Sequence, residues 1–233
     1  MKPFINNYND IMDLLDDKVA TVAWDEFFGD RKYNAPFIVQ NTMPDENLVE
    51  YLSKIMPIKT ALELGCGEGR NATYMSKERI SVTALDISST AIDNAKKIAK
   101  DSGVSIDFRC QDIIKSKING EYDFIYDSGL LHHLPPHRRL TYLELLQANL
   151  KPGGHFGLTC FAWGENCADE VNDWEFYEQK FSAGVAFSKE RLIELFSPSF
   201  EIIEIRKYKN HVPNTIQGLQ FMWVCLFKDR RVS

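Results

Sequence analysis

A glycine-rich turn between two apolar runs is the first stretch of the sequence whose composition suits ligand binding. The segment LELGCGEGR carries three glycines, which reach positive φ angles without strain and let a ligand approach the backbone closely. Its G-x-G-x-G spacing differs from the G-x-G-x-x-G of dinucleotide-binding turns, and its two glutamates would repel a pyrophosphate. A cationic or zwitterionic ligand therefore fits better, with an arginine available for a carboxylate. The ligand-binding residues predicted here are Glu63, Gly65, Cys66, Gly67, Gly69 and Arg70; Glu68 adds to the acidic character of the turn.

A carboxylate, Asp86, ends the next apolar run, ISVTALD. It follows the glycine turn by about twenty residues, the distance at which an acidic side chain in a βαβ unit accepts hydrogen bonds from ribose hydroxyls. A glycine turn alone also serves simply to connect a strand to a helix. Together, the turn and Asp86 predict a nucleoside site.

The ends of the third and fourth apolar runs carry further polar residues. Gln111 and Asp112 follow the third run, where the carboxylate could accept from an adenine amino group while Ile87 or Ile113 contacts the ring. Asp127 ends the fourth run and is predicted beside the glycine turn as a cofactor contact. Helix capping or an Asx turn is the structural alternative for both aspartates.

Short β-rich runs alternate with helical patterns from Thr60 onward, which predicts a doubly wound α/β fold. The helical segments follow the spacing of an apolar helix face. The last two strands are joined without a helical pattern, so we expect them to pair antiparallel at one edge. The predicted strands are 60–64, 80–86, 104–110, 122–127, 155–161, 200–208 and 219–227, and the predicted helices begin near Ser89, Pro136 and Ser188.

Two aromatic segments lie outside this pattern and are expected to roof an acceptor pocket. Residues 1–57 read as an N-terminal helical cap on a core of residues 58–233, and residues 162–187 read as an insertion within what is effectively one domain. An ordinary hydrophobic core is the alternative for their aromatic residues. The substrate-contact candidates are Trp24, Phe28, Tyr33 and Trp163. Acidic residues of the insertion, Asp173 among them, are expected to form its solvated face.

The order LELGCGEGR, ALDIS, CQDI, YDFIYDSGLLHHLPP and LKPGGHFGL resembles the class I S-adenosylmethionine-dependent methyltransferases over about residues 60–161. The GCGEGRNA and HHLPPHRR segments are most similar to the small-molecule branch near the thiopurine and tellurite-resistance methyltransferases. The resemblance implies a Rossmann-like seven-stranded sheet, mostly parallel, with an antiparallel last strand. It also implies S-adenosyl-L-methionine as the cofactor, with the glycine turn at its methionine part, Asp86 at the ribose, and Asp112 and Ile113 at the adenine.

Methyl transfer from a sulfonium is an in-line displacement with a neutral leaving group, so positioning is the main catalytic task. His132 and His133 follow the fourth strand and are candidates for a general base if the acceptor must lose a proton. A purely structural His-His-Leu turn is the alternative. A small molecule, such as a thiol that ionises without help, is the expected acceptor.

Composition limits the other possibilities. The net charge of −6 disfavours a nucleic-acid partner, and the basic cluster from His137 to Arg139 is expected to be a solvated helix face. The five cysteines lack metal-type spacing, so we expect free thiols and no metal. No secretory signal or membrane-spanning stretch is evident, which favours a cytoplasmic protein without a membrane partner. A non-catalytic cofactor-binding module, a protein or RNA methyltransferase and a nicotinamide enzyme remain the competing interpretations.

Overall fold

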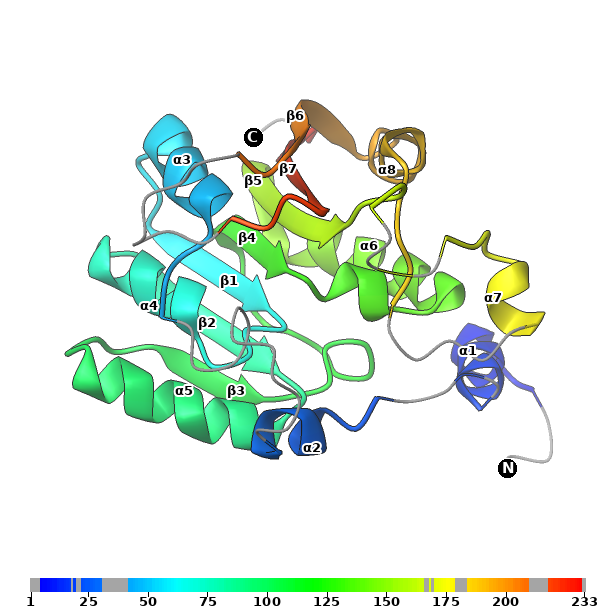
Figure 1. Cartoon of the computed structure of the whole chain (residues 1–233), viewed down its shortest axis with the longest axis horizontal. Helices are drawn as coiled ribbons and strands as arrows, with labels where there is room; N and C mark the ends of the chain where they lie inside the picture. Colours follow the sequence, from blue (N-terminus) through cyan, green and yellow to red (C-terminus); the bar gives the residue numbers. More distant parts are fainter. Residues whose placement is uncertain are drawn as a thin grey trace.

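The computed structural model describes residues 5–17, 19, 22–30, 42–165, 168, 170–178, 184–209 and 218–231. Within these ranges a seven-stranded sheet runs through the molecule in the order β3-β2-β1-β4-β5-β7-β6 (Figure 1). The strands are β1 (Thr60–Leu64), β2 (Ser81–Asp86), β3 (Asp107–Cys110), β4 (Tyr122–Ser128), β5 (Leu150–Phe161), β6 (Phe200–Lys207) and β7 (Met222–Asp229). The first five strands pair in parallel, and β7 is antiparallel to both β5 and β6. The predicted fold class is confirmed.

Helices cover both faces of this sheet (Figure 1). One face packs against α3 (Glu46–Ile55), α4 (Arg70–Lys77) and α5 (Ser89–Asp101), and the other against α6 (Pro136–Asn149) and α8 (Lys189–Phe196). Side chains alternate between the faces because successive strand residues point in opposite directions. Leu62 and Leu64 join the α6 side, whereas Ala61 joins the α3 side.

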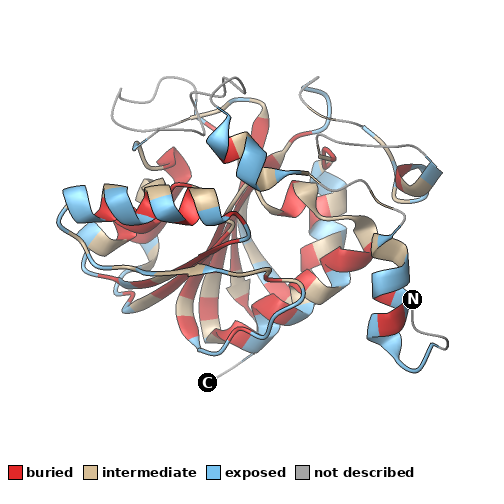
Figure 2. Ribbon diagram, turned by 90° about the horizontal axis from the view of Figure 1, so that it is seen from below, coloured by how far each residue is buried: buried red, intermediate tan, exposed pale blue. Residues whose placement is uncertain are grey.

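The helix α3 belongs to this packed core. Leu48 and Tyr51 are completely buried on its inner face, against the same hydrophobic cluster as α4. The earlier helices α1 (Tyr8–Asp16) and α2 (Trp24–Gly29), the 3₁₀ turn η1 (Leu131–His133) and the short α7 (Glu175–Glu178) instead lie toward the carboxyl ends of the parallel strands (Figure 1). Buried residues follow the strands and the inner helix faces, as Figure 2 shows.

Three strands begin three or more residues away from the sequence-based expectation. The strand expected from Val104 begins at Asp107, because the Val104 amide still closes the last turn of α5 by bonding the Ala99 carbonyl. The strand expected from His155 begins at Leu150, with a shift in register against β4. The last strand begins three residues later than predicted, at Met222. In the described part of the chain no helix is both long and apolar enough to cross a membrane.

Candidate cofactor site at the ends of strands β1 and β2

The glycine turn connects β1 to α4 in a conformation that side-chain-bearing residues resist. The φ angles are +67° at Gly65, +52° at Gly67 and +78° at Gly69. A Cβ on Gly65 would lie 2.7 Å from the Leu130 Cδ1 atom, and one on Gly69 would lie 3.0 Å from the Phe108 ring. These glycines are therefore needed both for the backbone path and for close packing.

Three backbone amides of this turn are bonded within the protein itself. The Gly67 N–H donates to the Asp86 carboxylate at 2.8 Å, the Cys66 N–H to the Leu85 carbonyl at 2.9 Å, and the Gly69 N–H to the Cys66 carbonyl at 2.9 Å. A phosphate-binding turn leaves such groups free for phosphate oxygens. The Gly67 amide instead faces a carboxylate, which would repel a pyrophosphate, so the turn is unsuited to a dinucleotide.

Asp86 joins the ends of β1 and β2 at this point. Besides the Gly67 amide it accepts the Ser88 N–H at 2.9 Å, so each carboxylate oxygen holds one backbone bond. Each oxygen has a second acceptor position, which suits a pair of vicinal hydroxyls. Burial raises the pKa of Asp86, whose side chain is nearly enclosed. The neighbouring Ile87 is 51% exposed and offers an apolar surface beside it.

The three residues that follow β3 have structural contacts beyond the cofactor contacts predicted for them. The Asp112 carboxylate accepts the amides of Ile114 at 2.9 Å and Lys115 at 3.3 Å, which is the capping alternative. The Gln111 amide bonds the Asp86 carbonyl and so aligns this end with β2. Ile113 packs into the core cluster. Ile87 is thus the exposed apolar side chain of the pair proposed for an adenine ring.

A buried polar network supports the turn from below, and it engages Arg70. The Arg70 guanidinium forms an ion pair with Asp45 at 2.7 Å and donates to the Ser128 hydroxyl at 3.0 Å. Asp45 is completely buried and also accepts from Tyr126 and Asn71. Arg70 therefore has a structural partner already, which the sequence could not show because Asp45 lies 25 positions away in the chain.

Two of the predicted acidic contacts lie beneath the turn. Burial raises the pKa of Glu63 to about 8, so this side chain is uncharged near neutral pH and adds no negative field, contrary to our expectation. Asp127 is fully buried and accepts the amides of Leu130 at 2.7 Å and Leu131 at 3.0 Å and the Tyr142 hydroxyl at 2.7 Å. Asp127 caps the chain after β4, and the prediction of a direct cofactor contact does not fit this position. The Cys66 side chain is also buried, so this residue contributes its backbone, and not its thiol, to the surface of the turn.

The helix α2 covers the turn. A Cβ on Gly67 would lie 3.3 Å from the Phe28 Cζ atom, so this aromatic ring rests directly on the glycine backbone. Asp25 fastens the helix by accepting the Ser88 hydroxyl at 2.8 Å, the Ser89 hydroxyl at 3.3 Å and the Thr90 amide at 3.1 Å. These bonds hold α2 at the start of α5, next to Asp86. Sequence reasoning missed Asp25, because acidic residues are common in a first helical turn and Asp25 carries no sign of its tertiary partners.

The two histidines after β4 lie in an aromatic cluster under α2. The Trp24 and His133 rings meet edge to face with centroids 4.7 Å apart, and His132 stacks on Phe161 at 3.8 Å. Burial lowers the pKa of His132 and lowers that of His133 to about 4. Both imidazoles are therefore neutral at physiological pH. Tyr33, the remaining N-terminal aromatic candidate, lies outside the described residues.

The low pKa of His133 predicts a loss of stability in acid. The unfolded chain binds a proton near pH 6.5 and the folded chain only near pH 4, so the free energy of unfolding falls as the pH drops through this window. A His133→Phe variant keeps a ring against Trp24 and removes the titration. Between pH 7.5 and pH 4.5 the free energy of unfolding of this variant is expected to fall by about 2 to 3 kcal/mol less than that of the wild type. Denaturant unfolding at both pH values measures this difference; equal losses in the two proteins would contradict it.

The basic cluster at the start of α6 is buried, contrary to the expectation of a solvated face. His137 and Arg138 bond Asp16 of α1, with Arg138 Nε at 2.9 Å from the carboxylate. Arg139 forms an ion pair with Asp173 at 2.5 Å. The insertion residue Asp173 therefore pairs with a buried arginine and is only partly exposed, whereas its sequence context predicted a solvated face. Docking of α1 and of the insertion onto α6 explains both corrections, because it covers side chains that a helix alone would leave in solvent.

Comparison with known proteins agrees with this arrangement. Residues 61–154 match the family described as a methyltransferase domain. A ubiquinone biosynthesis O-methyltransferase of Coxiella burnetii is 36% identical over 97 residues, a match that spans 41% of this chain and 41% of the relative. The probable S-adenosyl-L-methionine-dependent methyltransferase TehB of Haemophilus influenzae is 26% identical over 73% of this chain and 64% of its own length.

Solved structures extend the likeness to the fold as a whole. The 1,6-didemethyltoxoflavin-N1-methyltransferase of Burkholderia thailandensis superposes with a TM-score of 0.65, covers 98% of this chain and 93% of its own, and is 18% identical. Residues 61–154 thus resemble a methyltransferase domain, and the chain as a whole shares the Rossmann-like fold of this solved structure.

Proposed function

We propose that the protein is an S-adenosylmethionine-dependent methyltransferase that acts on a small molecule. The observation that carries this proposal is the hydrogen bond between the Gly67 amide and the Asp86 carboxylate. This bond occupies an amide that a phosphate would need, and it holds a carboxylate where that group would accept the ribose hydroxyls. The names of the similar proteins support a small acceptor, since one acts in ubiquinone biosynthesis and another was solved with 1,6-didemethyltoxoflavin and S-adenosylhomocysteine.

The residues of this chain would bind the cofactor and hold the acceptor in line. S-adenosylmethionine supplies a methyl group on a sulfonium, whose departure needs little acid catalysis. Asp86 would accept the ribose hydroxyls, Ile87 would pack against the adenine, and the glycine turn would face the methionine part. The α2 aromatic residues Trp24 and Phe28 would exclude water, which favours a soft or aromatic acceptor. A neutral His133 can accept a proton, although its lowered pKa makes it a weak base.

Titration calorimetry with S-adenosylmethionine, S-adenosylhomocysteine and NAD tests the cofactor assignment. We expect the first two compounds to bind and NAD to give no saturable heat, because the Cys66, Gly67 and Gly69 amides are already bonded within the protein and the Gly67 amide faces a carboxylate. Binding of NAD alone would overturn the proposal. Methyl transfer to a panel of thiols, phenols and amines then separates an enzyme from a binding module, since a module would bind the cofactor tightly and transfer nothing to any acceptor.

A further inference from the structure

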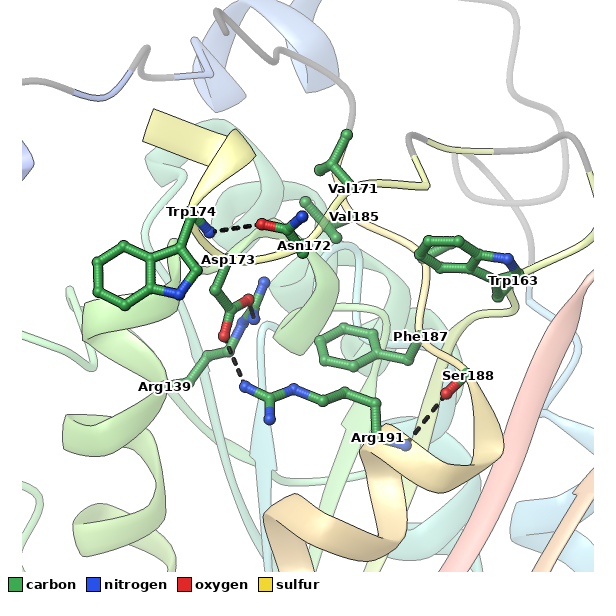
Figure 3. Close-up of a pocket in the computed structure, with 11 residues that line it drawn as sticks. Arg139, Trp163, Val171, Asn172, Asp173, Trp174, Val185, Phe187, Ser188 and Arg191 are labelled. Carbon is green, nitrogen blue, oxygen red and sulfur yellow. Dashed lines mark hydrogen bonds and ion pairs between the residues drawn. The ribbon is translucent and has the colours of Figure 1, made fainter. Parts of the chain in front are cut away.

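A cavity of about 420 Å³ lies between the insertion after β5 and the helices α6 and α8. Apolar side chains, including Trp163, Val185 and Phe187, form much of its wall (Figure 3). Its charged lining residues are Arg139, Asp173 and Arg191. The Val185 amide bonds the His132 carbonyl at 2.8 Å, which joins this wall to the turn that follows β4. The cavity therefore adjoins the carboxyl edge of the sheet, where the cofactor site lies.

Arg139 lines this cavity, and two of its three guanidinium nitrogen atoms have no hydrogen-bond partner among the described residues. Its side chain is 4% exposed, and its Nη1 atom pairs with Asp173 at 2.5 Å. The Nε and Nη2 atoms are buried and have no hydrogen-bond partner in the described part of the structure. One face of the guanidinium lies over the Phe187 ring, with Cζ 4.9 Å from the centroid. Buried donors without partners are costly, so they indicate a missing acceptor.

The unused atoms are the two that a carboxylate binds side by side. In the planar guanidinium, Nε–H and one Nη2–H point in the same direction along one edge and match the spacing of two carboxylate oxygens. Asp173 pairs with the Nη1 atom instead, and Phe187 lies over one face of the guanidinium. We propose that this edge of Arg139 binds the carboxylate of a small organic acid whose apolar body occupies the cavity.

The charges of the cavity favour an incoming anion. Asp173 is shared between two guanidinium groups, because Arg191 Nη2 lies 2.6 Å from its second oxygen (Figure 3). Arg191 has a second partner, the exposed Glu194, whereas the ion pair of Arg139 with Asp173 is shared. The charge of Arg139 is thus less fully compensated than that of Arg191, and a carboxylate bound to Arg139 would compensate it. That the organic acid is the methyl acceptor rests on the proposed function, whereas the binding site itself does not.

Titration with phenylacetate and its neutral amide phenylacetamide tests the site, with the Arg139 Nε–H signal followed by ¹⁵N NMR. Phenylacetate is expected to shift this signal saturably, and phenylacetamide to leave it unchanged. An Arg139→Gln variant should bind phenylacetate at least about tenfold more weakly. Arg139→Lys keeps the charge but loses the bidentate edge, so it should also bind more weakly. The exposed Arg109, paired with Asp107 on β3, provides the control variant Arg109→Gln, which should bind like the wild type.

Three outcomes would contradict a carboxylate site at Arg139. Equal binding of acid and amide, equal binding by wild type and Arg139→Gln, or no response to phenylacetate would overturn the site. Repeating the titration with S-adenosylhomocysteine distinguishes the two proposals. Tighter phenylacetate binding in its presence supports an acceptor subsite next to the cofactor. If the wild-type protein binds phenylacetate but binds neither S-adenosylmethionine nor S-adenosylhomocysteine, the carboxylate site is retained and only the proposed function is contradicted.

Discussion

An Asp86→Ala variant is expected to bind S-adenosylhomocysteine roughly ten- to 150-fold more weakly than the wild type. The carboxylate lies at the junction of β1 and β2, and each of its oxygens retains an acceptor position after bonding the Gly67 and Ser88 amides. Charge-assisted hydrogen bonds from two ribose hydroxyls would be lost together with the order of the turn. Calorimetric dissociation constants at fixed ionic strength measure the effect.

Asp107→Ala is the matched control for this experiment. Asp107 is an exposed carboxylate at the first residue of β3, where it pairs with Arg109. Its removal should leave cofactor affinity unchanged. Thermal unfolding of both variants separates a damaged site from a damaged fold. A folded Asp86→Ala protein with wild-type affinity would remove this carboxylate from the cofactor site.

Replacing Asp45 with alanine should lower the free energy of unfolding by about 3 to 5 kcal/mol. Although burial alone would raise it, the pKa of Asp45 is lowered, chiefly by the neighbouring Arg70 guanidinium. Without the carboxylate, the buried Arg70 charge loses its ion pair and the Ser128 hydroxyl loses its acceptor. The Tyr126 hydroxyl is left with the longer bond to Asn47 Oδ1 at 3.3 Å. Urea-induced unfolding at neutral pH gives the value.

A double-mutant cycle shows whether the loss comes from the unpaired charge. Arg70→Met removes that charge and keeps an apolar chain of similar length. In the Asp45→Ala background it should restore part of the lost stability, so the double variant should be less destabilised than the sum of the single ones. Asp107→Ala serves again as the exposed comparison and should cost less than about 1 kcal/mol. Simple additivity at Asp45 and Arg70 would contradict the proposed coupling.

Local residue patterns were sufficient for the architecture and for the position of the glycine turn. Alternating apolar runs and helical spacing are short-range signals, and both survive in the sheet and in helices α5, α6 and α8. The turn could be recognised because its glycines meet a backbone requirement that is local in sequence. The same signals misplaced the start of β3 by three residues, since the end of a helix and the start of a strand compete for the same amides.

The functions of individual acidic and basic side chains could not be read in this way. Asp112 and Asp127 both follow strands, yet both cap the chain that follows, and the choice depends on which amides the turn presents. Glu63 counted as a charge in the sequence, whereas its burial between packed layers keeps it neutral. Arg138 and Arg139 looked like surface residues, because their partners Asp16 and Asp173 are more than thirty positions away.

The sequence by itself determined the doubly wound sheet, the glycine turn and the acidic end of β2, because each depends on residue types within a few positions of one another. The tertiary structure decided which amides are occupied, which carboxylates are charged, and where a buried arginine is left with a free edge. Those properties depend on contacts between distant segments and on exclusion of water, and neither is encoded in local spacing.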